Sequence, residues 1–217
     1  MTERSVSSGQ AYSEHQAKGY EEDPEHTLFP AEQRVWIDAI SDLGLPLSSR
    51  ILDFGAGTGA LLATLKTRGL HALGLEPSAP MIQQALLLHP DLEATDFKRG
   101  DAGAMESDSR LFDLIVSRQV LCHIDQPARD FGRLRSLLKP GGSLMLVDGF
   151  WPAKSWSPEQ LFALPFAALT SADPVADLLV TIGFDVLEAR LFNDLNTARR
   201  EAFPGSKDRY IVVARRQ

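Results

Sequence analysis

The sequence predicts an α/β fold in which a doubly wound, mostly parallel sheet is covered by helices on both faces. Three observations predict it. Apolar stretches of strand length alternate with helical patterns at least four times. A glycine-rich turn at residues 55–59 connects the first of these strands to its helix. The last two apolar stretches, 184–191 and 210–214, are separated by about eighteen residues of polar loop, which favours an antiparallel pair.

Residues 1–44 are expected to form a polar tail and a cap helix. The helix begins at Pro30, carries Trp36 in its apolar pattern and ends at Gly44. The tail contains three candidate substrate-contacting side chains, Tyr12, His15 and Tyr20. We interpret the tail either as a partly disordered end or as a segment that folds over a bound substrate.

The core is expected between residues 45 and 149. Its strands are predicted at residues 51–54, 71–75, 97–99, 112–116 and 143–147, and the third has the weakest pattern. Its helices are predicted from Ala60 to Gly69, over Met81–Leu88, and over Pro127–Leu138.

Two further segments complete an expected single domain of residues 1–217. Residues 150–170 are rich in aromatic residues and prolines, which indicates a lid-like insert that faces the substrate. Residues 171–217 are expected to hold a helix that starts at Asp173-Pro174 and the two final strands. The basic residues near the end are interpreted as solvated surface: Arg199, Arg200, Lys207, Arg209, Arg215 and Arg216.

Composition disfavours several classes of protein. The formal net charge of −7 argues against unaided binding to nucleic acid, whose phosphates need a basic surface. No apolar run approaches the roughly 18 residues needed to cross a bilayer, so no membrane partner is expected. Cys122 is the only cysteine, and no Cys/His ladder suggests a metal site. The polar N-terminus predicts a cytoplasmic protein. Independently of this, a monomer or homodimer is expected.

A polar residue closes each predicted core strand. These residues are Asp53, Glu76, Asp101, Ser117 and Asp148. The carboxyl ends of parallel strands share one edge, and ligands of such sheets bind there. One such residue fits an ordinary strand terminator, but five together indicate a binding site.

The glycine turn and Glu76 indicate a ligand that contains a nucleoside. An acidic residue about twenty positions after the glycines can accept hydrogen bonds from both ribose hydroxyls, in NAD or in another nucleoside. Asp53 would repel a pyrophosphate at the turn, whereas it would attract a ligand with an amino group and a sulfonium. Asp101 is placed to accept a hydrogen bond from the exocyclic amine of an adenine.

These residues resemble the class I S-adenosylmethionine-dependent methyltransferases. The resemblance runs from Arg50 to Asp148 and depends on five segments in order: D-F-G-A-G-T-G (53–59), L-E-P-S (75–78), G-D-A-G-A-M (100–105), F-D-L-I-V-S (112–117) and L-K-P-G-G-S-L-M-L-V (138–147). It implies a Rossmann-like, mostly parallel seven-stranded sheet with an antiparallel last strand and an N-terminal helical cap. The implied cofactor is S-adenosylmethionine, and the implied activity is methyl transfer.

The resemblance also implies roles for individual positions. Gly55, Ala56 and Gly57 would pack against the methionine part of the cofactor, with Asp53 near its amino group. Glu76 would hold the ribose hydroxyls. The other implied contacts are Pro77 and Met81 along the adenine, Asp101 and Ala102 at its edge, and Ser117 and Arg118 at the methionine end.

The methyl acceptor is expected to be a small molecule. The fourth strand leads into S-R-Q-V at residues 117–120 and lacks the N-P-P-Y type of motif found in many enzymes that methylate amino groups of nucleic acid or protein amides. Trp151 and Trp156 in the insert would suit an apolar or aromatic acceptor, as in secondary metabolism. For an acceptor that starts protonated, His123 is the candidate base. Asp148 and the tail residues Tyr12, His15 and Tyr20 are alternatives.

Two other functions stay open at this point. An NAD(P)-dependent oxidoreductase would need a catalytic pair such as Tyr and Lys, and the chain has no Y-x-x-x-K motif. A non-catalytic cofactor-binding protein would keep the glycines but lack an acceptor pocket, which the aromatic insert disfavours.

Overall fold

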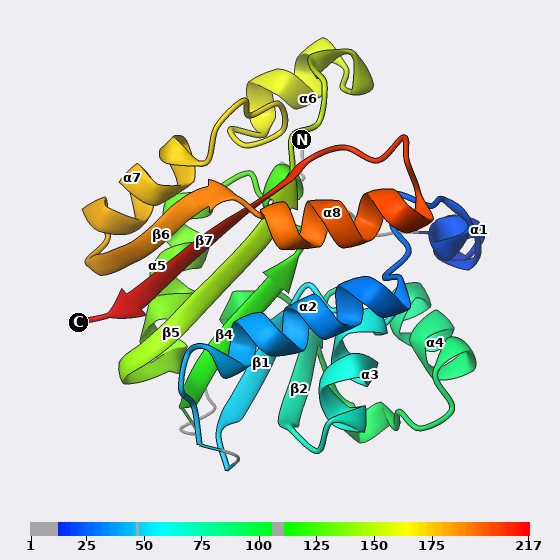
Figure 1. Cartoon of the computed structure of the whole chain (residues 1–217), viewed down its shortest axis with the longest axis horizontal. Helices are drawn as coiled ribbons and strands as arrows, with labels where there is room; N and C mark the ends of the chain where they lie inside the picture. Colours follow the sequence, from blue (N-terminus) through cyan, green and yellow to red (C-terminus); the bar gives the residue numbers. More distant parts are fainter. Residues whose placement is uncertain (1–12, 47, 106–110) are drawn as a thin grey trace, which may run out of the picture.

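A seven-stranded sheet forms the centre of the protein (Figure 1), in the order β3-β2-β1-β4-β5-β7-β6. The computed structural model describes residues 13–46, 48–105 and 111–217. The strands are β1 (Arg50–Phe54), β2 (His71–Glu76), β3 (Phe97–Arg99), β4 (Phe112–Arg118), β5 (Leu138–Gly149), β6 (Phe184–Leu191) and β7 (Arg209–Arg216). β1 to β5 pair in parallel, and β7 pairs antiparallel with β5 and β6. The predicted mostly parallel sheet with an antiparallel last strand is confirmed.

Helices cover both faces of this sheet, as Figure 1 shows. They are α1 (Glu14–Gly19), α2 (Pro30–Ser41), α3 (Ala60–Thr67), α4 (Ala79–Leu88), α5 (Pro127–Leu137), α6 (Pro158–Ala163), α7 (Asp173–Thr181) and α8 (Asn193–Ala202). Trp36, Leu65 and Leu195 place α2, α3 and α8 in the apolar core of one face. Phe131 and Val175 place α5 and α7 in the core of the other. No helix in the described ranges is long and apolar enough to cross a membrane.

Short 3-10 turns connect several of these elements. They are η1 (Tyr20–Glu22), η2 (Ala94–Asp96), η3 (Ala102–Met105), η4 (Leu121–His123) and η5 (Ala153–Ser155). The insert at 150–170 consists of η5, α6 and irregular chain, and the side chains of α6 are exposed. Phe166 and Ala167 of this insert are buried, and Phe166 packs on Phe131 with ring centroids 6.2 Å apart and joins the core.

The interpretation of the segment before the last strand was wrong. The expected polar loop contains the helix α8, which buries Leu195 and Ala198 on a stripe too narrow to stand out among its polar residues. The basic residues near it are not all solvated, since Arg199 and Arg209 are only 1% and 2% exposed. Each is buried because a carboxylate from the N-terminal segment pairs with it.

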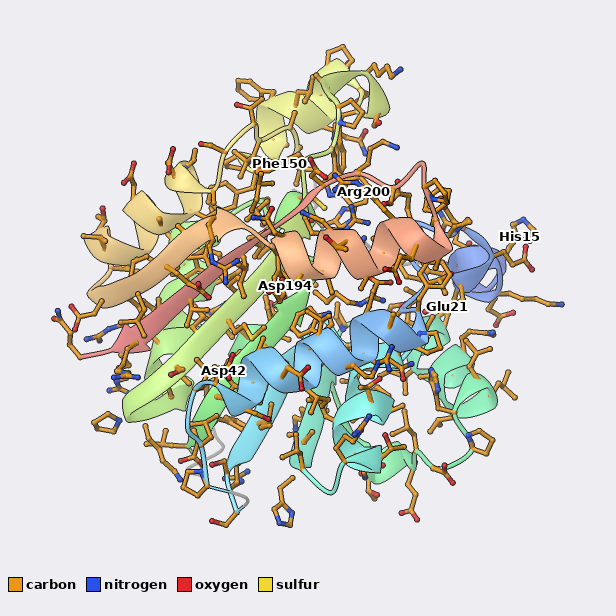
Figure 2. The ribbon with its side chains drawn as sticks, in the orientation of Figure 1. His15, Glu21, Asp42, Phe150, Asp194 and Arg200 are labelled. Carbon is orange, nitrogen blue, oxygen red and sulfur yellow. The ribbon has the colours of Figure 1, made fainter. Side chains whose placement is uncertain are left out.

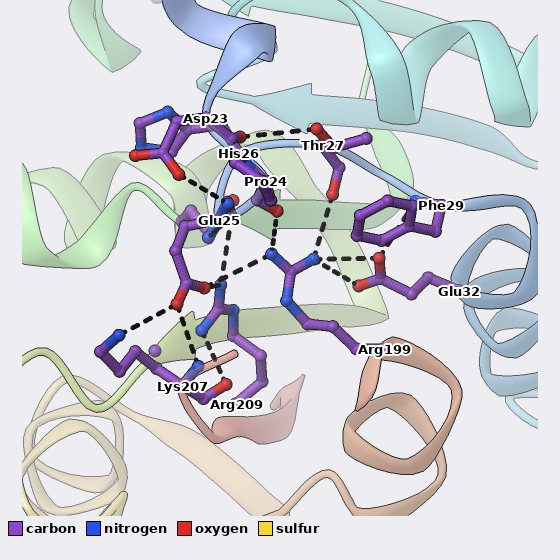
Figure 3. Close-up of polar contacts among 12 residues, drawn as sticks. Asp23, Pro24, Glu25, His26, Thr27, Phe29, Glu32, Arg199, Lys207 and Arg209 are labelled. Carbon is purple, nitrogen blue, oxygen red and sulfur yellow. Dashed lines mark hydrogen bonds and ion pairs between the residues drawn. The ribbon is translucent and has the colours of Figure 1, made fainter. Parts of the chain in front are cut away.

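These buried ion pairs tie the two ends of the chain together (Figure 3). Arg199 on α8 donates to both carboxylate oxygens of Glu32 on α2, at 3.0 and 2.9 Å. Arg209 at the start of β7 pairs with Glu25 at 2.8 Å, and Lys207 also donates to Glu25. The N-terminal segment therefore depends for its position on residues about 170 positions later in the chain.

The described part of the tail is ordered. Ser13 caps α1 through a capping box with Gln16, and α1 packs beside α4. η1 follows, and the Thr58 hydroxyl donates to the Glu21 carboxylate, which links the tail to the glycine turn. Tyr12 lies outside the described residues. Residues 13–26 pack against the body of the protein, and that they fold over a bound substrate stays a prediction.

We expect Arg199→Ala to lower the free energy of unfolding by about 3–5 kcal/mol, because the buried Glu32 carboxylate loses its cationic partner and keeps only the Phe29 N–H as a donor. Arg200→Ala is the matched control. Arg200 pairs with Asp208, its side chain is 49% exposed, and its loss should change stability by less than about 1 kcal/mol. Urea denaturation of both variants checks this, and equal effects would contradict the structural role of the buried pair.

Candidate active site

β1 ends in a turn with a backbone conformation that glycine adopts most readily. Gly55 and Gly57 have φ angles of 75° and 55°, in the left-handed region. A Cβ on Gly55 would also lie 2.3 Å from Cγ2 of Val120, which leaves no room for a side chain. α3 begins directly after the turn, so its free N–H groups lie at the carboxyl edge of the sheet.

Glu76 is fixed against this turn at the end of β2. Its Oε2 accepts a hydrogen bond from the Gly57 N–H at 2.9 Å, and its Oε1 accepts one from the Ser78 N–H at 2.8 Å. Burial raises the pKa of Glu76, while the two N–H groups counter that rise. Each carboxylate oxygen keeps a second lone pair, so Glu76 can accept further hydrogen bonds from a ligand.

Asp53 is buried without full compensation. It is 1% exposed, and its Oδ2 has no hydrogen-bond partner within the described residues. Burial raises the pKa of Asp53 to about 7, although Arg118 lowers it, and Glu76 raises it further. A buried carboxylate with a free oxygen is suited to a cationic ligand that also donates hydrogen bonds.

Two small cavities share Gly55 in their linings. One is lined by Tyr20, Asp53, Gly55, Ala56, Gly57, Thr58, Leu61 and Arg118. The other is lined by Phe54, Gly55, Pro77, Asp101, Val120, His123, Ile124 and Asp130. Most of the residues expected to bind a cofactor therefore lie at one edge of the sheet.

The expected cofactor residues outside these two linings are buried: Glu76, Met81, Ala102 and Ser117. Met81 and Ala102 are 2% and 1% exposed, and the Met81 Cε lies 3.7 Å from where a Cβ on Gly57 would stand. Asp101 accepts a hydrogen bond from the Gly103 N–H at 2.9 Å, which orients its carboxylate in the loop after β3. Ser117 donates to the Phe54 carbonyl at 2.9 Å, so its side chain ties β4 to β1.

The expected acceptor residues lie in different places in the structure: one is buried, one is exposed, and one lines a cavity. Asp148 is fully buried, and its oxygens accept from the N–H groups of Cys122 and Gly149 and from the Trp151 indole. His15 lies on the exposed side of α1 and points into solvent (Figure 2). Tyr20 lines the first cavity. Asp148 and Trp151 thus support the loops beside the site.

His123 and Trp156 meet beside the second cavity. Their rings are 5.7 Å apart in an edge-to-face arrangement. Burial lowers the pKa of His123, while Asp148 raises it and His26 lowers it further, so the imidazole is neutral at pH 7. The buried Trp156 Nε1–H has no hydrogen-bond partner within the described residues. The role of His123 as a base stays a prediction.

Sequence reasoning missed two residues of this site. His26 stacks on Tyr20 with ring centroids 4.0 Å apart and a 4° interplanar angle. Gln119, just after β4, has a φ of 58°, rare outside glycine, and its amide donates to the Glu25 carbonyl at 2.9 Å. His26 was absorbed into a polar tail, and no local signal in the sequence marks the strained Gln119 backbone.

Comparison with known proteins gives a consistent family. Residues 28–191 match the family described as "Methyltransferase domain". A protein of Pyrenophora dematioidea named "O-methyltransferase" is 28% identical over 78% of this chain and 68% of its own length. A "Ubiquinone biosynthesis O-methyltransferase" of Cereibacter sphaeroides is 24% identical over 80% of this chain and 79% of its own.

A solved structure has the same fold. Phosphoethanolamine N-methyltransferase 2 of Haemonchus contortus, in complex with S-adenosylhomocysteine, superposes with a TM-score of 0.67 at 17% identity. It covers 95% of this chain, and this chain covers 58% of that one. The unpartnered Asp53 oxygen beside glycine backbone, with Glu76 one strand away, fits the ammonium and ribose groups of S-adenosylmethionine.

We expect the affinity for S-adenosylmethionine to rise with pH, by up to about tenfold per unit, until the pH passes about 7. A cationic ligand favours the ionised form of Asp53 and so lowers its pKa, which means that binding below pH 7 releases a proton. Calorimetry in buffers of different ionisation enthalpy measures both quantities. Asp53→Asn should remove this proton release, and an unchanged release in that variant would contradict the assignment.

We expect Glu76→Ala to weaken the binding of S-adenosylhomocysteine by more than about tenfold, because the charge-assisted hydrogen bonds expected between Glu76 and the ribose hydroxyls would be lost. Glu93→Ala, at an exposed position before η2, is the control and should bind normally. Calorimetry measures both. Unchanged affinity of the Glu76 variant would remove this residue from the site.

Proposed function

The chain belongs to the class I S-adenosylmethionine-dependent methyltransferases, and from this premise we propose that it methylates a hydroxyl group of a small aromatic molecule. The observation that carries the acceptor proposal is the pair of His123 and Trp156, with a neutral imidazole and an unpartnered buried indole N–H. Two relatives with O-methyltransferase names support a hydroxyl acceptor.

The residues of the chain bind and align the reactants. S-adenosylmethionine, when bound, supplies an electrophilic methyl group on a sulfonium. Asp53 would hold its amino group and Glu76 its ribose hydroxyls. Pro77 and Asp101 would lie along its adenine. These contacts would fix the direction from which an acceptor approaches, and alignment of this kind accounts for much of the catalysis of such a transfer.

On the acceptor side, Trp156 would close a flat pocket over His123. Its free indole N–H would donate a hydrogen bond to an oxygen of the acceptor, and its ring would pack on the acceptor's apolar part. The exposed helix α6 follows Trp156 directly, so movement of α6 would open and close this pocket.

Several finer features belong to the same proposal. We propose a cytoplasmic protein that acts as a monomer or homodimer without nucleic acid. We also propose a single domain, with residues 45–149 as cofactor core and 150–170 as lid. Calorimetry with S-adenosylmethionine, S-adenosylhomocysteine and NADH tests the cofactor. Binding of NADH alone would favour a dinucleotide-dependent oxidoreductase instead.

The acceptor proposal is tested with S-adenosylmethionine that carries a deuterated methyl group. Wild-type protein is incubated with phenols, catechols and hydroxyquinones, and with amines of similar size, and products are identified by mass. Methyl ethers are expected. Methylated amines alone would contradict the hydroxyl acceptor but leave the methyltransferase activity intact.

We expect Trp156→Phe to lower kcat/KM for a methylated phenol by about tenfold, because the ring is kept but one hydrogen bond to the acceptor is lost. Binding of S-adenosylhomocysteine should be unchanged. Leu161→Ala on the exposed helix α6 is the control and should leave both quantities unchanged. Steady-state kinetics and calorimetry check this, and a cofactor defect in the Trp156 variant would contradict the acceptor-side placement.

A further inference from the structure

The backbone around His26 is held more tightly than a polar tail requires. Four consecutive carbonyls, from Pro24 to Thr27, each accept a hydrogen bond from a side chain of the protein body. The four donors, which we call the N-terminal anchor, are Arg118, Gln119, Arg199 and Arg209. Figure 3 shows the two arginines from the C-terminal region reaching this segment.

Two residues of the N-terminal anchor carry buried charge. Arg199 and Arg209 lie nearly fully buried and need Glu32 and Glu25 to neutralise them. Buried ion pairs of this kind are weak sources of stability but hold a unique geometry. His26 belongs to the segment that these ion-paired arginines hold in place.

The ring of His26 is fixed in orientation and tautomer. It stacks on Tyr20, which lines the cavity of Asp53 and Gly57. Its Nδ1 lies 3.0 Å from the Tyr20 carbonyl, which only accepts hydrogen bonds, so Nδ1 carries the proton of the neutral ring. Nε2 therefore presents a lone pair, and the hydrogen bond of the His26 ring within the described residues is the one at Nδ1.

We propose that His26 accepts the proton of the acceptor hydroxyl during methyl transfer, an inference that rests on the function proposed above. A lone pair of the hydroxyl oxygen forms the bond to the methyl carbon. The carbon–sulfur bond breaks, and its electrons stay on sulfur, which becomes a neutral thioether. The hydroxyl proton passes to Nε2 of His26, so the products are a methyl ether and an imidazolium.

Charged groups around His26 are compatible with this role. Glu21 and Asp23 lie on its own segment, Arg118 approaches from the end of β4, and His123 approaches from η4. Burial lowers the pKa of His26 below 6.5, the Tyr20 carbonyl and Asp23 raise it, and Arg118 lowers it again. The ring is therefore neutral at pH 7 and free to take a proton.

His123 is less suited to the same task. Its ring makes no hydrogen bond within the described part of the chain, so its tautomer is not fixed. His26 stacks on Tyr20, which lines the cavity of Asp53, where the resemblance places the methionine end of the cofactor. The structure thus favours the histidine of the tail over the one that follows a core strand.

The first experiment compares two phenols whose need for a base differs. Catechol keeps its hydroxyl proton at about pH 8, while 4-nitrophenol has largely lost it. In the full chain, His26→Phe keeps the stack on Tyr20 but removes both nitrogens. We expect its kcat to fall about 100-fold or more with catechol and less than about tenfold with 4-nitrophenol. In wild-type protein the rate with catechol should fall at low pH, where His26 becomes protonated (the low-pH limb of the rate profile). His26→Phe should lose this limb.

Matched variants make the result specific. His71→Gln, at the exposed start of β2, should behave as wild type. His123→Phe should keep the low-pH limb. Equal losses of His26→Phe on both phenols, or loss of the limb only in His123→Phe, would overturn the assignment. If wild-type protein fails to bind S-adenosylhomocysteine, the proposed function itself fails, and the two failures are thereby distinguished.

A second measurement does not depend on turnover. In nitrogen-15 spectra of the complex with S-adenosylhomocysteine, His26 should be the Nδ1–H tautomer at pH 7, and its Nε2 signal should shift when catechol is added. A proton on Nε2, or an Nε2 signal that catechol leaves unmoved, would overturn the proposal. This reading decides the question even if neither phenol is methylated.

Discussion

Two carboxylates buried at the ends of adjacent parallel strands are the constraint on which the site depends. Asp53 and Glu76 are both buried, but only Glu76 accepts backbone hydrogen bonds on both carboxylate oxygens. Without a ligand, burial raises the pKa of Asp53 to about 7, so its carboxyl group is close to half protonated at pH 7. A ligand with a positive charge and hydroxyl donors would compensate the burial of both carboxylates. The glycine turn allows such a ligand to approach, because its residues carry no side chains there.

The N-terminal segment reaches the same edge by a different kind of interaction. Its described residues add no strand to the sheet, and the carbonyls of residues 24–27 accept hydrogen bonds from side chains rather than from a neighbouring strand. Glu25 and Glu32 neutralise Arg209 and Arg199, and the arginines in turn grip the segment. α8 and β7 therefore fix the position of this segment, which carries the Tyr20–His26 stack beside the cavity of Asp53.

The parallel core was predictable because its signals are local. Apolar runs identify β1, β2, β4 and β5 without knowledge of their neighbours, and the spacing between Gly57 and Glu76 fixes where the two meet. α8 and the anchor were not predictable in this way. Arg199 and Glu32 are 167 residues apart, and a sequence read locally gives each a charge but no partner. Unpaired charges are expected on the surface, which is why these arginines were misplaced.

The two histidines show the same limit at the level of chemistry. His123 attracts attention because it follows a core strand, and position after a strand is a sound guide to where ligands bind. A base must also present a lone pair in a fixed direction, and that depends on what holds its other nitrogen. For His26 the holder is a carbonyl six residues earlier, in a stretch without periodicity. Hydrogen bonds from residues far along the chain hold that stretch in place. The position of a residue after a strand therefore indicates where the site lies, whereas the hydrogen-bond partners of a residue indicate its role.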